Sequence, residues 1–178
     1  MEAQLIESAL LAIVNFQTLI ATKAARIRLA ANGGSVLEFG LRRAQGVDGA
    51  LSAARAAFIG GAAATSNTLA GRRFGIPVRG TMAHSWIMAF ASEREAFQHY
   101  AETYPDNCVL LIDTYDTLGS GIENAVAVGQ GLTPSQKKRF GVRLDSGDLE
   151  YLSKKARAML DDSGLREVRI FSARDLGV

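Results

Sequence analysis

The sequence is poor in cysteine and proline. Its single cysteine, Cys108, excludes an internal disulfide, and the chain has no CxxC pair that would clip a metal ion. One thiol among 178 residues fits a reducing compartment, so we expect a cytoplasmic protein. Only three prolines accompany an apolar share of 48%, which excludes a disordered chain and predicts a soluble globular protein with one sizeable core.

The net excess of positive over negative charge is also small. The formal net charge of +2 gives no support to a nucleic-acid partner or an acidic membrane surface. The N-terminal apolar run is short and is interrupted by Asn15 and Gln17, and it carries acidic Glu2 and Glu7 where a signal peptide is basic. We therefore expect neither an export signal nor a membrane span.

Three common catalytic motifs are missing. The chain has no GxxxxGKS/T phosphate loop, no GxGxxG after a strand and no GxSxG nucleophile turn. What it has is an alternation of short apolar runs and helical patterns. The predicted strands are 36–39, 76–78, 109–112, 141–144 and 168–171. The predicted helices are 3–31, 48–59, 66–74, 93–104, 121–129 and 149–160.

The strand pattern predicts the fold class. Apolar runs without polar alternation are typical of strands buried on both faces, as in parallel sheets. Helices between such strands indicate right-handed β-α-β units, so the class is α/β. Five strands with four crossovers are compatible with an open doubly wound sheet and with part of a β/α barrel.

Unusual polar residues follow the predicted strands. They are Arg42 and Arg43 after the first strand, Thr81, His84 and Ser85 after the second, Asp113 and Asp116 after the third, and Arg143 and Asp145 at the fourth. Parallel β/α folds place their active sites at the carboxyl ends of strands, so we expect these residues at one mouth.

The chemistry of this set is anion handling beside carboxylates. Arginines bind phosphate and carboxylate groups, and aspartates hold ribose hydroxyls, bind Mg²⁺ or stabilise a developing cation. A histidine there is an acid/base group or a phosphoryl acceptor. Structural explanations stay open: His84 as a helix cap or a satisfied loop residue, an aspartate of LIDTYD as the cap of the next helix, and Arg42 with Arg43 as a surface pair. We assign Asp148 as the N-cap of the helix that follows it.

Five segments carry a family resemblance. FGLRRAQGVDGAL, IGGAAATSNTLAG, GIPVRGTMAHSWI, LIDTYDTLGSG and GVRLDSGDL occur in this order and closely resemble nicotinate phosphoribosyltransferases. The resemblance implies an enzyme that joins nicotinate to phosphoribosyl pyrophosphate in NAD biosynthesis, with ATP as co-substrate, Mg²⁺ accompanying both phosphate substrates, and a homodimer. It implies a partial irregular β/α barrel of the type II phosphoribosyltransferases, with about five parallel strands and outer helices.

The resemblance also implies roles for individual residues. His84 resembles the histidine that ATP phosphorylates, and Asp145 resembles the carboxylate beside the ribose. Asp113 and Asp116 resemble parts of the same pocket. The implied substrate contacts are Arg42, Thr81, Ser85, Asp116 and Arg143.

Two departures from the family bear on function. Family members are longer, and the regions with an aromatic nicotinate contact and with the 5′-phosphate loops are missing, while residues 172–178 drift from the family pattern. We therefore expect residues 1–178 to form a single partial catalytic domain, truncated at both ends and with little activity alone. A nicotinamide phosphoribosyltransferase-like enzyme and a non-catalytic remnant acting as an interaction module are the alternatives.

Overall fold

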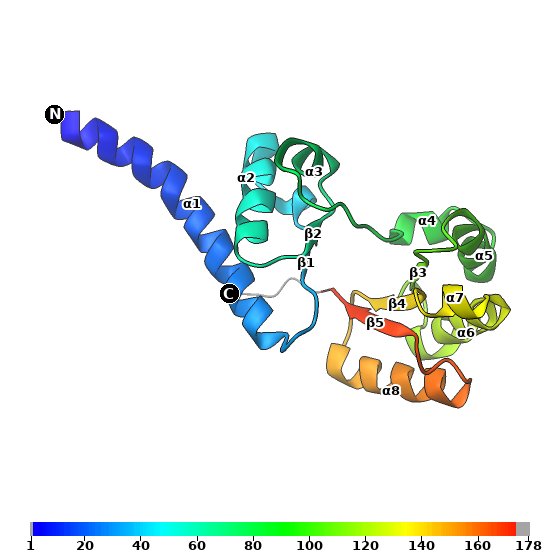
Figure 1. The fold of residues 1–178 in the computed structure, drawn as a ribbon. Helices are drawn as coiled ribbons and strands as arrows, with labels where there is room; N and C mark the ends of the chain where they lie inside the picture. The colour runs from blue at the N-terminus through cyan, green and yellow to red at the C-terminus, as the bar shows by residue number, and fades with distance from the viewer. Residues whose placement is uncertain (1, 174–178) are drawn as a thin grey trace. The chain divides into compact units, whose positions relative to one another are not determined.

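The computed structural model describes residues 2–173, so the end of the chain that drifts from the family pattern lies mostly outside the described residues. The chain divides into two compact units, Met1–Gly80 and Thr81–Val178 (Figure 1). Within residues 2–173 the strands form two separate parallel sheets, one in each unit. No ladder hydrogen bonds join the two sheets within these residues.

The first unit is mainly helical. Its elements are α1 (Glu2–Ala30), β1 (Leu37–Glu38), the 3-10 turn η1 (Leu41–Arg43), α2 (Gly46–Ile59), β2 (Ala64–Thr65) and α3 (Thr68–Phe74). The three predicted helices are confirmed with small changes of their ends. Strand β2 was not predicted, because its two residues lie between Ala-rich helices without an apolar run of their own.

The expected strand 76–78 is reduced to a single parallel bridge between Thr65 and Val78. Pro77 has no N–H group and therefore cannot extend a ladder of hydrogen bonds. Its carbonyl still accepts from the Thr65 N–H at 3.0 Å. This segment therefore lies beside β2 without forming a full strand.

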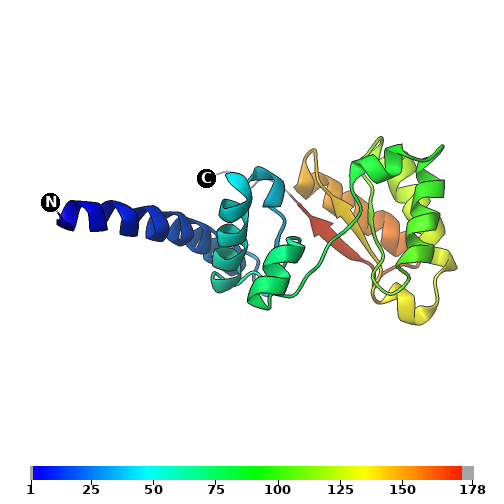
Figure 2. The same cartoon turned by 90° about the horizontal axis from the view of Figure 1, so that it is seen from above.

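Small residues let α1 pack closely on α2. A Cβ atom on Gly60 would lie 2.3 Å from the carbonyl oxygen of Ala21, so this crossing requires a glycine. Ala24 and Ala57 are buried in the same contact. Towards its N-terminus α1 runs away from α2 (Figure 2).

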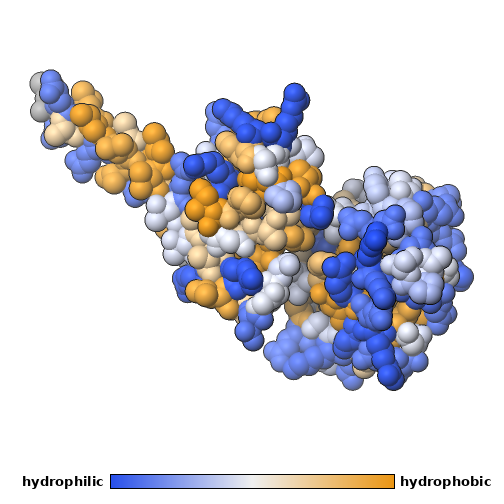
Figure 3. All heavy atoms as spheres, in the orientation of Figure 1, coloured by the Kyte–Doolittle hydropathy of each residue, from blue (hydrophilic) through white to orange (hydrophobic). Residues whose placement is uncertain are grey.

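The outer half of α1 exposes large apolar side chains. They include Leu5, Ile6, Leu10, Leu11, Ile13 and Val14. Figure 3 shows these apolar atoms along the projecting part of the helix. By length and composition alone α1 qualifies as a candidate membrane span, a test that signal sequences and core helices of soluble proteins also pass. The expectation that the chain has no span therefore stays a prediction.

The second unit holds the larger core. Its elements are α4 (His84–Met88), α5 (Glu93–Thr103), β3 (Val109–Leu111), the π-turn η2 (Thr117–Gly121), α6 (Ile122–Gly131), α7 (Pro134–Lys137), β4 (Gly141–Leu144), α8 (Leu149–Asp162) and β5 (Arg169–Ser172). The strands pair in parallel in the order β3-β4-β5. The predicted strands and helices of this unit are confirmed, whereas α4, α7 and η2 were not predicted.

The side chains of β4 alternate between a face of the sheet that packs into the core and a face that carries polar groups. Val142 and Leu144 are fully buried in the core that also contains Phe97 of α5 and Leu160 of α8. Because successive side chains point to opposite faces of a strand, Arg143 projects from the other face. Helix α5 packs on α6, and α6 packs on α8.

The core of this unit also encloses the single thiol. Cys108 is fully buried, and burial raises the pKa of its thiol to about 12. At the opposite end of β3 from Cys108, Gly121 lies so close to the chain that a Cβ atom there would be 2.0 Å from the Ile112 carbonyl oxygen. The α/β class with parallel strands is confirmed, and within residues 2–173 neither sheet closes on itself.

We expect the exposed face of α1 to make the isolated 178-residue chain self-associate. A Leu or Ile side chain gains about 1.5–3 kcal/mol when it is fully buried, so two of them strongly favour association. Replacing Leu10→Glu and Ile13→Glu together is expected to shift the chain towards monomer, as measured by light scattering. Gln4→Glu with Ser8→Glu adds the same charge at exposed polar positions and serves as the control. Equal effects of the two pairs would show that charge, and not apolar area, governs association.

Candidate active site

The polar residues of the second unit gather at the carboxyl ends of β3 and β4. Asp113 follows β3 by two residues, Arg143 is the third residue of β4, and Asp145 follows that strand directly. Leu111 and Arg143 are register partners, so the two ends lie side by side. His84 begins α4 and reaches the same edge. This is the edge at which parallel α/β folds bind their ligands.

A buried carboxylate organises the site. The side chain of Asp113 has no exposed surface, and its Oδ2 accepts from the Asp145 N–H at 2.8 Å and from the Ser146 hydroxyl at 2.5 Å. Its Oδ1 lies 3.3 Å from His84 Nε2. A buried charge is tolerated when donors surround it, and these three donors come from two different segments. Asp113 therefore fixes the histidine and the loop after β4 together.

His84 is held at the site without being buried. Its side chain is 41% exposed, so the imidazole stays accessible to a ligand. Ala83 precedes the helix in an extended conformation, and no side chain caps α4. His84 is thus the first residue of α4 and pairs with a carboxylate, so the helix-cap explanation does not apply.

Helix α4 is held against α5 by the contacts of Trp86. The indole N–H of Trp86 donates to the Ala96 carbonyl oxygen at 3.2 Å. The Trp86 ring packs against Phe90 and Tyr100, with centroid distances of 5.0 and 6.1 Å. These contacts set the position of the short helix and hence of His84.

Arg143 and Asp145 form an ion pair beside the histidine. Arg143 Nη2 donates to Asp145 Oδ2 at 2.8 Å, and Nη1 donates to Thr81 Oγ1 at the same distance. The two charged side chains are 13% and 22% exposed, so solvent screens the pair only in part. A guanidinium beside a carboxylate at an open strand end offers one group for an anion and another for a developing positive charge.

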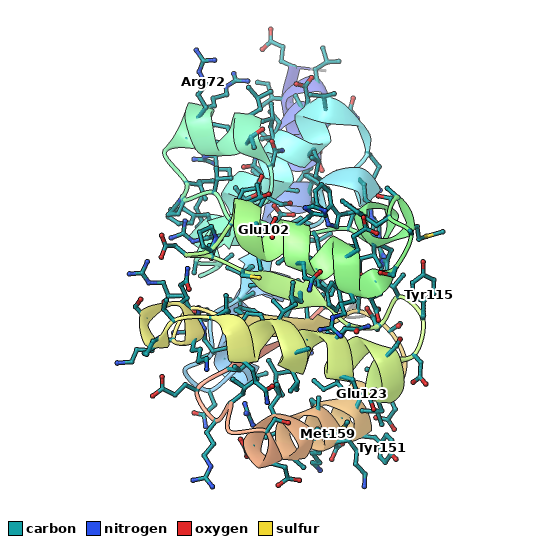
Figure 4. The ribbon with its side chains drawn as sticks, turned by 90° about the vertical axis from the view of Figure 1, so that its right-hand side faces the viewer. Arg72, Glu102, Tyr115, Glu123, Tyr151 and Met159 are labelled. Carbon is teal, nitrogen blue, oxygen red and sulfur yellow. The ribbon has the colours of Figure 1, made fainter. Side chains whose placement is uncertain are left out.

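Three predicted site residues lie outside this network. Asp116 is exposed, and its carboxylate accepts from the Gly119 N–H at 3.1 Å at the start of η2. Ser85 is exposed on α4. Arg42 lies on η1 in the first unit, where it is exposed. In Figure 4, Tyr115 marks the loop between Asp113 and Asp116 at the edge of the second unit.

Sequence reasoning missed two residues that the structure connects to the site. Ser146 contacts Asp113, and its position in the DSGD segment after a predicted strand was a signal that this hydroxyl could join the cluster. Trp86 gave no such signal, because its role depends on packing. The assignment of Asp148 as a helix cap is confirmed, since its carboxylate accepts from the Tyr151 N–H at 3.0 Å.

The described residues do not form a resident metal site. Among residues 2–173, no group of three or more His, Cys, Asp or Glu side chains is placed to hold an ion. Both oxygens of Asp113 already face donors of the protein.

We expect Asp113→Asn to destabilise the second unit by about 1–3 kcal/mol, because one acceptor oxygen becomes an NH₂ group that faces another donor. Urea unfolding followed by circular dichroism measures this change. Asp116→Asn is the matched control, since an amide oxygen caps a turn nearly as well as a carboxylate. Equal losses of stability in the two variants would contradict the role given to Asp113.

Comparisons with known proteins place the chain in a family. The model of the nicotinate phosphoribosyltransferase (NAPRTase) family matches residues 35–168. The nicotinate phosphoribosyltransferase of Bacillus subtilis (strain 168) is 56% identical over 175 residues, which are 98% of this chain and 35% of that protein. Nicotinate phosphoribosyltransferase pncB2 of Mycobacterium tuberculosis (strain H37Rv) is 49% identical over 175 residues, 98% of this chain and 37% of that protein.

A solved structure agrees with these sequence matches. The crystal structure of human nicotinic acid phosphoribosyltransferase superposes with a TM-score of 0.79 at 33% identity, covering 99% of this chain and 46% of that one. The chain spans about a third of the length of the curated relatives. Since the family model covers most of the sequence, the chain belongs to the nicotinate phosphoribosyltransferase family.

Proposed function

We propose that this chain forms the part of a nicotinate phosphoribosyltransferase that carries the reacting groups. The reaction joins nicotinate to phosphoribosyl pyrophosphate, giving nicotinate mononucleotide and pyrophosphate in NAD biosynthesis, while ATP is hydrolysed to ADP and phosphate. The observation that supports it most is the buried carboxylate of Asp113, which holds His84 and the Asp145 loop together beside Arg143. Family membership supplies the identity of the substrates.

Asp145 and Arg143 would act on the phosphoribosyl group. The bond from ribose C1 to pyrophosphate breaks as the nicotinate nitrogen forms its own bond to C1, and positive charge develops on the sugar. A fixed, partly buried carboxylate at Asp145 stabilises that charge. Arg143 already lies against Asp145 and Thr81, so its guanidinium is oriented to bind a phosphate or carboxylate oxygen in the same pocket.

His84 would accept the γ-phosphoryl group of ATP. The carboxylate of Asp113 faces Nε2, which favours the imidazole tautomer with its proton on that atom. The lone pair then lies on Nδ1, which attacks the γ-phosphorus. A bond from nitrogen to phosphorus forms, the bond to the ADP oxygen breaks, and ADP leaves with the electron pair. Water later hydrolyses the phosphohistidine.

The remaining expected residues receive supporting roles. Ser85, next to His84 on α4, would lie on the nicotinate side, while Asp116 would order the η2 turn at the rim of the pocket. Arg42 would bind an anionic group of a substrate. Mg²⁺ would arrive bound to phosphoribosyl pyrophosphate and ATP, because the described side chains form no site of their own for it.

The finer features of the family are part of the same proposal. In a longer protein the two parallel sheets would join an irregular β/α barrel of the type II phosphoribosyltransferases, working in the cytoplasm as a homodimer. The regions that the longer relatives have in addition would provide the 5′-phosphate loops and the aromatic nicotinate contact.

The experiment that tests this function measures nicotinate mononucleotide formation. The 178-residue chain is assayed alone and together with polypeptides that correspond to the additional parts of its longer relatives. We expect little product from the chain alone and ATP-stimulated product from the mixture. Failure of the mixture, with all parts folded, would favour a non-catalytic role as an interaction module.

We expect His84→Ala to remove the stimulation by ATP in the active mixture and to leave some transfer that is independent of ATP. The physical reason is that the variant lacks the nitrogen that receives the phosphoryl group. Acid-labile labelling from γ-labelled ATP measures the acceptor directly. Persistence of that label in the variant would place the phosphorylated residue elsewhere.

We expect Asp145→Asn to lower turnover by roughly 10²–10³-fold, because the amide keeps the shape of the side chain and loses the charge that stabilises the ribosyl cation. Asp148→Asn is the matched control in the same loop. Its carboxylate only caps α8, a role that an amide fills nearly as well. Similar losses of turnover in the two variants would refute the role assigned to Asp145.

A further inference from the structure

A second carboxylate closes a hydrogen-bond network at the strand ends of the first unit. Glu38, the last residue of β1, accepts from the Gly40 N–H through Oε1 and from the Thr65 hydroxyl through Oε2, both at 2.5 Å. Glu38 and Thr65 are also register partners in the parallel pair β1-β2. The carboxylate therefore bridges the loop that leaves β1 and the end of the neighbouring strand.

The network continues into the next helix. Thr65 is fully buried, and its Oγ1 also accepts from the Asn67 N–H at 3.0 Å. The Asn67 side chain in turn accepts from the Ala70 N–H at 3.0 Å and so caps α3. Each polar group in this network is hydrogen-bonded to the next one, so the position of the Glu38 carboxylate is fixed by β2 and by the start of α3.

Glu38 controls the start of the turn that carries Arg42. Gly40 is the N-cap of η1, and its carbonyl oxygen accepts from the Arg43 N–H at 2.9 Å. A Cβ atom on Gly40 would lie 3.0 Å from Glu38 Oε1, so the glycine leaves room for the carboxylate. The Gly40 N–H therefore ties the first residue of the arginine turn back to β1 and β2.

We propose that Glu38 is a positioning residue that fixes the Gly40–Arg43 turn so that Arg42 binds an anionic group of the substrate. This inference rests on the proposed function only for the anion-binding role of Arg42. Glu38 acts through the turn and does not itself contact the substrate. A diphosphate or carboxylate group is the ligand chemistry that an exposed arginine on such a turn suits.

The direction in which anion affinity changes when Glu38 is removed distinguishes a positioning role from a purely electrostatic effect of its charge. A carboxylate close to an anion site repels the anion, so its removal by itself strengthens binding. If Glu38 positions Arg42, its removal weakens binding instead, because the Gly40 N–H of the turn loses its acceptor and the link through the carboxylate to Thr65 is broken. Asp48, an exposed carboxylate in the first turn of α2, has the same charge and offers a matched control.

The test uses the 178-residue chain with inorganic pyrophosphate as the probe. Hydrogen exchange of peptides that span Gly40–Arg43 reports the turn, and titration calorimetry reports the affinity. Glu38→Ala is expected to speed exchange in these peptides and to raise the Kd for pyrophosphate about tenfold. Glu38→Gln keeps one acceptor and is expected to recover part of both losses. Asp48→Ala is expected to leave exchange unchanged and the affinity equal or higher.

Two further variants keep the outcomes separate. Thr65→Val retains the shape of the side chain and removes the hydroxyl, so it repeats the effect of Glu38→Ala in milder form even where the alanine variant folds poorly. Arg42→Ala tests the anion site alone. Pyrophosphate binding that survives Arg42→Ala would overturn the role of Arg42, while exchange still decides whether Glu38 holds the turn. Unchanged exchange and affinity in Glu38→Ala and Thr65→Val would overturn the positioning role.

Discussion

A carboxylate removed from water has to find hydrogen-bond donors inside the protein, and Asp113 finds them on segments that are distant in the sequence. The Asp145 N–H and the Ser146 hydroxyl come from the loop after β4, and the imidazole of His84 comes from the start of α4. These segments meet because one buried charge needs all of them. The carboxylate of Asp113 therefore ties the loop after β4 and the start of α4 to the end of β3.

The first unit uses the same device in a smaller form. Glu38 lies at the end of a parallel strand and accepts from Thr65 on the neighbouring strand, just as Asp113 accepts from the Asp145 N–H beyond β4. In both units a carboxylate joins the carboxyl ends of two adjacent strands and orders the loop that carries a basic or nucleophilic side chain. The two units thus use a carboxylate at the strand ends in the same way, although their sheets are separate.

Within residues 2–173 the sequence predicted every helix except α4 and α7, four of the five strands and the cap at Asp148, because these depend on local periodicity and on one side chain. It did not predict that the strands form two separate sheets. The segment 76–78 has the apolar pattern of a strand, but Pro77 limits it to a single bridge with Thr65. Of the site, the strand-end rule placed His84, Asp113 and Asp145 together. Which atoms pair, and the support from Trp86, depend on tertiary packing that no local pattern records.

The fastening of α4 also gives the molecule an optical property. Trp86 is the single tryptophan of the chain, and its indole sits between Phe90, Tyr100 and the Ala96 carbonyl oxygen. The emission wavelength of Trp86 depends on how far water reaches its indole ring. Two residues away on the same short helix stands the imidazole of His84. The intrinsic fluorescence of the protein therefore reports whether α4, the helix that carries His84, is packed against α5 or has separated from it.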